Sequence, residues 1–173
     1  MTTLWAVRLF VASDAFTFAA LLLGYAYLRA HSGSWPAPFT LLPGLLLTAI
    51  LLASSFSMAK AVRSPKAAKP WLLATLVCGV AFLVLHSLEW RHLIAERQVG
   101  LHDNPWGVPL FGATFFTLTG LHMAHVAAGV AVIGGLLRGS SLQALRAANL
   151  YWQFVDGVWL FLFPAVYLTA LQS

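Results

Sequence analysis

The stretch Thr117-Leu-Thr-Gly-Leu-His-Met-Ala-His-Val126 decides how this chain must fold. It places two histidines and two threonines inside an apolar run from Leu110 to Leu137, which is longer than the ~20 residues that a membrane-spanning helix needs. Ionisable side chains inside a membrane span are costly and usually functional. The stretch therefore predicts a spanning helix whose polar side faces protein or a lined cavity.

The composition of the whole chain also indicates a membrane protein. Of 173 residues, 60% are hydrophobic and only 9% are charged, which is more apolar surface than a soluble domain can bury. The formal net charge of +5 does not indicate a nucleic-acid partner, because the basic residues lie in short connections between apolar runs. The single cysteine, Cys78, excludes an internal disulfide.

Five stretches are long and apolar enough to span a bilayer. They are Leu9 to Leu28, Leu41 to Ala59, Trp71 to Trp90, Leu110 to Leu137 and Leu150 to Leu171. We predict an all-α bundle of five transmembrane helices, with residues 1–173 forming a single domain. The first stretch lacks a basic leader and a small-residue cleavage site, so we expect it to be a retained span.

The basic residues are distributed unequally between the two sides of this predicted bundle. One side holds seven of them, Arg8, Lys60, Arg63, Lys66, Lys69, Arg138 and Arg146, and the other holds Arg29, Arg91 and Arg97. Cytoplasmic loops carry an excess of Lys and Arg. The distribution therefore predicts a cytoplasmic N-terminus and a periplasmic C-terminus.

Two carboxyl groups enter the predicted bundle from the cytoplasmic side. Asp14 lies six residues beyond Arg8, which places it ~9 Å into its span if Arg8 remains at the surface. Asp156 lies at a similar depth in the fifth helix. We expect Asp14 to be protonated, paired or hydrated, with His125 or Asp156 as its neighbour. Such a carboxyl suits proton exchange.

Polar residues follow one side of the last two predicted helices. At 100° per residue, one arc of the fourth helix, ~140° wide, contains Thr114, Thr119, His122, His125 and Gly129. The fifth helix carries Trp152, Gln153, Asp156 and Trp159 at spacings of three and four. Glycine permits close backbone approach and polar side chains bond across helices in membranes. We therefore predict that Thr119, Gly129, Trp152, Gln153 and Trp159 lie at helix interfaces.

Intramembrane histidines also suggest a haem site. His122 and His125 project from one helix face, so they cannot ligate opposite faces of one haem. His86 is expected to lie deeper toward the outer side than either, ~24 Å along its helix from Pro70. No further His, Cys or carboxylate has the spacing of a metal-ligand set. We expect no catalytic, metal or cofactor site, although a membrane cytochrome or a small transporter remains an alternative.

Near the outer end of the third helix, Glu89 is expected to pair with Arg91 or Arg97. At this depth the carboxylate can reach the membrane interface, so it indicates a function less strongly than the deeper groups do.

Several segments together resemble one known family. The run Gly112-Ala-Thr-Phe-Phe-Thr-Leu-Thr-Gly-Leu-His-Met-Ala-His-Val126 resembles the hallmark of subunit III of haem-copper respiratory oxidases, and Tyr151-Trp-Gln-Phe-Val-Asp-Gly-Val-Trp-Leu-Phe161 is similar to that family's last helix. Ser13-Asp14 resembles the start of its acidic helix, and Leu88-Glu-Trp90 resembles a further element. The segments follow the family's order, and the chain is similar to its five-helix bacterial form.

Two residues depart from the family pattern. The family commonly has glutamate where Asp14 stands, but some quinol oxidase members carry aspartate, so this acid does not identify the electron donor. Gln153 stands where histidine is usual, which removes a titratable group but keeps the capacity for hydrogen bonds.

The resemblance implies an accessory subunit in a bacterial plasma membrane. It would bind catalytic subunit I, other oxidase subunits and phospholipid, while haem and copper would lie in the partner subunits. It would stabilise the catalytic subunit and support proton uptake during oxygen reduction. The residues expected to serve as proton-uptake, lipid or structural sites are Asp14, Glu89, His122, His125 and Asp156. A quinol oxidase or nitric oxide reductase is the alternative to a cytochrome c oxidase.

Overall fold

The computed structural model describes residues 2–32, 35–36, 41–139 and 141–167, and the regular secondary structure of this part is helical throughout. The elements are α1 (Thr2–His31), α2 (Leu41–Arg63), the short 3-10 helix η1 (Pro65–Ala67), α3 (Ala68–Ala95), α4 (Pro109–Leu136) and α5 (Leu142–Val166). The prediction of an all-α fold is confirmed. The predicted end of the fifth span, Leu171, lies outside the described residues.

The helix ends follow local sequence signals. Pro109 begins α4, where its missing N–H leaves no extra unsatisfied donor. The hydroxyl of Ser141 accepts a 3.2 Å hydrogen bond from the backbone N–H of Ala144 and caps the start of α5. Several helices extend beyond the predicted spans, and α3 continues five residues past Trp90 to Ala95. This extension changes the depth of the residues near its end.

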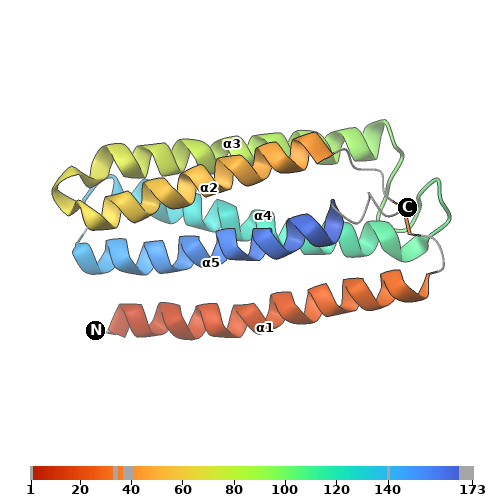
Figure 1. Cartoon of the computed structure of the whole chain (residues 1–173), viewed down its shortest axis with the longest axis horizontal. Coiled ribbons are helices and arrows are strands. Elements are labelled where there is room, and N and C mark those ends of the chain that lie inside the picture. Colours follow the sequence, from red (N-terminus) through yellow and green to blue (C-terminus); the bar gives the residue numbers. More distant parts are fainter. Residues whose placement is uncertain (1, 33–34, 37–40, 140, 168–173) are drawn as a thin grey trace.

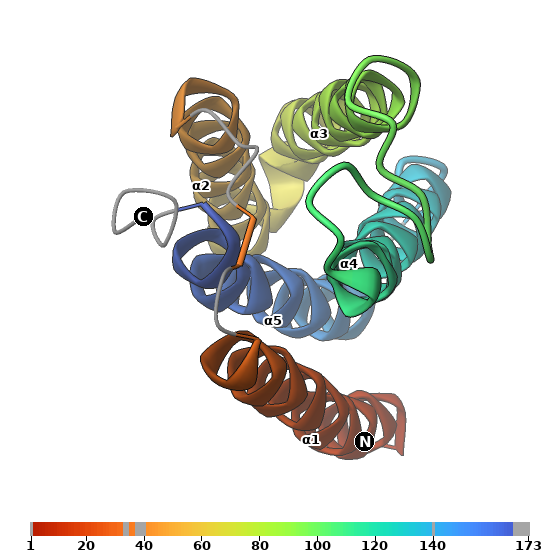
Figure 2. The same cartoon turned by 90° about the vertical axis from the view of Figure 1, so that its right-hand side faces the viewer.

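Successive helices run in opposite directions, so that α1 begins and α5 ends at opposite ends of the bundle (Figure 1). Figure 2 shows α5 in the middle, between α1 on one side and the pair of α2 and α3 on the other. The α5 helix packs against α1, α2 and α4. In contrast, α1 lies at the edge and packs mainly against α5.

Four of the helices are long and apolar enough to cross a membrane, namely α1, α2, α3 and α4. The central helix α5 is not among them, so four of the five predicted spans have this support. The central position of α5 explains why it can carry polar side chains within the bundle. Since α5 contacts protein on several sides, its polar side chains can bond to other helices instead of meeting lipid.

A large buried indole organises the centre of the bundle. Trp152 on α5 is fully buried, and glycines from two helices pack against its ring. A Cβ atom at Gly79 on α3 would lie 2.9 Å from this ring, and one at Gly129 on α4 would lie 2.7 Å from it. Only glycine therefore lets α3 and α4 approach α5 at this level without displacement of the indole.

Candidate functional site

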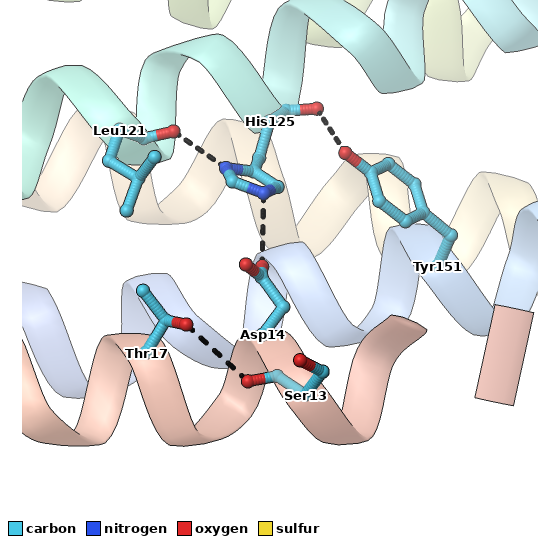
Figure 3. Close-up of polar contacts among 6 residues, drawn as sticks. All are labelled: Ser13, Asp14, Thr17, Leu121, His125 and Tyr151. Carbon is cyan, nitrogen blue, oxygen red and sulfur yellow. Dashed lines mark hydrogen bonds and ion pairs between the residues drawn. The ribbon is translucent and has the colours of Figure 1, made fainter. Parts of the chain in front are cut away.

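Asp14 on α1 and His125 on α4 meet inside the bundle (Figure 3). The carboxyl Oδ2 lies 3.0 Å from the imidazole Nε2, and the two side chains are only 14% and 13% exposed. The contact has the distance of an ion pair, and this oxygen forms no hydrogen bond of good geometry among the described residues. Of the two neighbours expected for Asp14, the structure shows His125 in contact with it.

The position of the second imidazole nitrogen fixes the proton content of this pair. His125 Nδ1 lies 2.7 Å from the backbone carbonyl of Leu121, which can only accept a hydrogen bond, so Nδ1 carries a proton. A bare Nε2 would repel a carboxylate oxygen at 3.0 Å. A proton on either the imidazole or the carboxyl removes this repulsion. In both forms the pair has no net charge, which suits a membrane interior.

Aromatic side chains hold the His125 ring in place. Phe18 packs edge-on against it with ring centroids 5.3 Å apart, and Phe10 contacts it at 6.3 Å. The hydroxyl of Tyr151 on α5 donates a 2.9 Å hydrogen bond to the backbone carbonyl of His125 (Figure 3). Three helices thus position one imidazole beside one carboxyl group.

His122 lies one turn away from His125 but faces other helices. Its ring stacks on Trp159 of α5 with centroids 5.3 Å apart, and Phe82 of α3 packs edge-on against it. His86 contacts the same two rings, at 5.5 Å each. The prediction that His86 lies at a different depth from His122 is therefore wrong. Because α3 extends beyond its predicted end, His86 lies ~14 Å inside the helix terminus.

Neither of these histidines is exposed, and their four ring nitrogens have no hydrogen-bond partner among the described residues. Trp90 Nε1, beside His86, is also buried and without a partner there. Within the same described part, no group of three or more His, Cys, Asp or Glu side chains is placed to hold a metal ion.

Asp156 joins α5 to α2 and does not contact Asp14. Its Oδ2 accepts hydrogen bonds from the hydroxyls of Ser54, at 3.5 Å, and Ser55. Trp152 Nε1 donates to Ser54 Oγ at 2.9 Å, and Gln153 Nε2 donates to the carbonyl of Ser55 at 3.1 Å. The α2 serines were not identified from the sequence. The sequence feature that could have identified them is the adjacent pair Ser54-Ser55 within an apolar run.

Trp159 and Thr119, two other residues predicted at helix interfaces, are both buried. Trp159 Nε1 donates a 3.0 Å hydrogen bond to Thr48 Oγ1 on α2. Thr119 is fully buried, but its hydroxyl bonds within α4 to the carbonyl of Phe115 at 2.7 Å. Thr114 likewise bonds to the carbonyl of Leu110 at 2.7 Å. These two hydroxyls therefore bond to backbone carbonyls of α4 itself and do not link it to another helix.

Glu89 has a partner that the sequence did not indicate. The hydroxyl of Tyr167 donates a 2.5 Å hydrogen bond to its Oε2, in place of the expected pairing with Arg91 or Arg97. Tyr167 is nearly fully buried directly after α5, and Glu89 lies in the C-terminal part of α3. The expectation was wrong because adjacency in sequence does not show which distant segment packs on a helix.

The chain matches the family model of cytochrome c oxidase subunit III over residues 2–171. It is 35% identical to cytochrome c oxidase subunit 3 of Synechocystis sp., with 95% of this chain and 75% of the relative aligned. It is 32% identical to cytochrome c oxidase subunit 3 of Alkalihalophilus pseudofirmus, over 92% and 82% of the two chains. It is also 35% identical to subunit 3 of the cytochrome bo(3) ubiquinol oxidase of Pseudomonas aeruginosa, over 96% and 84%.

Proposed function

Since the chain belongs to the cytochrome c oxidase subunit III family, we propose that it is an accessory subunit that stabilises the catalytic subunit I of a terminal oxidase and supports its proton uptake. Haem and copper then belong to the partner subunits. The pair of Asp14 and His125 is the observation that carries the proton role. The family match favours this function over a small transporter or a membrane cytochrome.

The proton role rests on the chemistry of the Asp14–His125 pair. With the proton on the imidazole, the two partners carry opposite charges; with the proton on the carboxyl, both are neutral. The pair has no net charge in either form. Imidazole and carboxyl groups are the side chains that most often pass protons in enzymes, so such a pair can serve as a proton donor or acceptor. This chain contains no further row of titratable groups leading across the bundle from it, within the described residues. We therefore place the pair beside the proton entry of the catalytic subunit.

Grooves between α1 and α5 support lipid binding by this subunit. A groove of about 490 Å³ at the N-terminal ends of these helices is lined by Trp5, Gln143 and Arg146 among others. The exposed guanidinium of Arg146 suits a lipid phosphate. A second groove of about 400 Å³, lined by apolar side chains including Phe18 and Phe161, suits acyl chains. Phospholipid bound here would cover the seam between the two helices.

For the topology, we propose five spans in a bacterial plasma membrane, with the N-terminus in the cytoplasm. The excess of basic residues on one side supports this orientation. In this orientation the Asp14–His125 pair lies nearer the cytoplasmic side, from which a respiratory oxidase draws its protons.

A quinol oxidase is the second candidate for the complex. The 35% identity to the ubiquinol oxidase subunit equals the identity to the Synechocystis cytochrome c oxidase subunit. To decide, the tagged chain is purified from its native membrane and the co-purifying subunits are identified. The complex is then assayed with reduced cytochrome c, with ubiquinol and with nitric oxide. We expect a haem-containing catalytic subunit and oxygen consumption with one donor; isolation of the chain without any haem protein contradicts the proposed function.

A further inference from the structure

His86, His122 and Trp90 form a buried polar cluster that the proposed function does not use. His86 and His122 are 0% exposed, and both pack against Phe82 and Trp159. Trp90 follows His86 by one turn of α3, with ring centroids 6.3 Å apart. Each of the five ring nitrogens is buried and has no hydrogen-bond partner in the described part of the chain.

Unpaired nitrogens of this kind are costly in a membrane interior. A neutral imidazole has one N–H donor and one bare acceptor, and the indole of Trp90 adds one donor. Neither ring forms an ion pair with a carboxylate among the described residues, so a charged imidazole would be a buried ion without a partner. The cluster therefore contains neutral rings with both donors and acceptors to satisfy. Polar groups in such positions are usually bonded to protein or to buried water.

The neighbouring side chains cannot supply these hydrogen bonds. Trp159 directs its N–H toward Thr48 on α2, and Thr119 donates its hydroxyl proton to the carbonyl of Phe115. Phe82 offers only the face or edge of its ring, which gives at most a weak N–H contact. The missing partner must therefore both donate and accept while carrying no charge.

We propose that His86 and His122, with the Trp90 indole N–H, bind ordered water between α3 and α4. Water donates to a bare imidazole nitrogen and accepts from an N–H, and a buried water typically uses about two to four polar partners. A metal cation does not match this donor set, because the cluster has two imidazoles and no carboxylate or thiolate. The bound water joins two helices at a level where aromatic rings otherwise fill the core. This site is separate from the Asp14–His125 pair and does not depend on its role.

The direct test is solid-state NMR on the full chain in lipid bilayers, with ¹⁵N-histidine and ¹³C-tryptophan labels. His86 and His122 are recognised by their contacts to tryptophan rings, whereas His125 contacts phenylalanine and tyrosine. We expect both ring N–H signals to correlate with water that exchanges slowly with bulk solvent. Exposed His31 serves as the positive control for exchange with bulk water. Absence of the water correlation at both buried rings, or a change of their signals on addition or chelation of Zn²⁺, overturns the proposal.

A stability cycle tests the same site independently. The thermal unfolding midpoint is measured for His86→Phe, His122→Phe and the double variant. If water links the rings, each single change leaves the other ring without its partner, so the double variant should lose less than the sum of the two single losses. The control cycle combines His122→Phe with Phe82→Leu, which reports packing against a neighbour without polar atoms. Equal coupling in the two cycles contradicts a water link.

Discussion

Asp14 and His125 connect α1 to α4 through a 3.0 Å contact between carboxyl and imidazole, although α1 packs mainly against α5. The contact is polar, partly exposed and isolated from the Asp156 network on the other side of α5. Such a link can serve proton exchange, attachment of α1, or both. Substitutions that keep one property and remove the other separate these roles.

We predict that Asp14→Asn retains the subunit in the complex but weakens sustained turnover. The asparagine amide can donate to the bare Nε2 of His125 and keep the helix contact, but it cannot exchange a proton. We expect sustained turnover to fall about fivefold, which corresponds to ~1 kcal/mol in the activation free energy. Oxygen consumption over many cycles and quantification of the bound subunit provide the measurement. Asp14→Glu is the control and should remain near the original activity. Full sustained turnover of Asp14→Asn with the subunit retained would refute the proton role.

Asp156 is expected to act in stability and not in proton uptake. Asp156→Ala removes the acceptor for the Ser55 hydroxyl and the longer 3.5 Å contact from Ser54, whose hydroxyl also donates to the Leu51 carbonyl at 2.7 Å, and should lower the free energy of unfolding by ~1–3 kcal/mol. Asp156→Asn keeps an acceptor oxygen, so its loss should be smaller. Thermal unfolding of the purified subunit and turnover of the complex are compared. A fall in turnover with unchanged stability would show that Asp156 takes part in proton transfer.

Gly129→Ala should destabilise the bundle because the new Cβ atom would lie 2.7 Å from the Trp152 ring. Overpacking of this kind costs ~1–3 kcal/mol. Gly135→Ala on the same helix is the matched control, since no heavy atom lies within 4 Å of its new Cβ atom. That change should be neutral or slightly stabilising, because alanine is the better helix former. Equal unfolding midpoints of the two variants would contradict this interpretation.

The proposed orientation is tested by cysteine labelling. In a Cys78→Ser background, a cysteine at Lys66 in η1 should react with a membrane-impermeant reagent only after the membrane is opened. A cysteine at His102, in the exposed connection between α3 and α4, should react from the periplasm without opening. Reaction at position 66 in intact cells would reverse the topology.

The sequence by itself determined the class of the molecule and the positions of its helices. Long apolar runs separated by turn-forming or basic segments leave few alternatives, because a backbone in lipid must satisfy its hydrogen bonds within each helix. The pattern also selected Asp14, His125 and Asp156 as groups of interest, since ionisable residues within apolar runs are rare. The residue spacing even limited the neighbours of Asp14 to two.

Only the tertiary structure decided which of these groups meet. Asp14 pairs with His125 while Asp156 bonds to α2, because the central position of α5 turns its polar side away from α1. His86 and His122 contact the same two rings, Phe82 and Trp159, because α3, α4 and α5 pack together at this level. Glu89 meets Tyr167, which lies 78 positions later in the chain. The periodicity of a helix gives the face on which a side chain lies, but the packing of helices against one another determines what that face contacts.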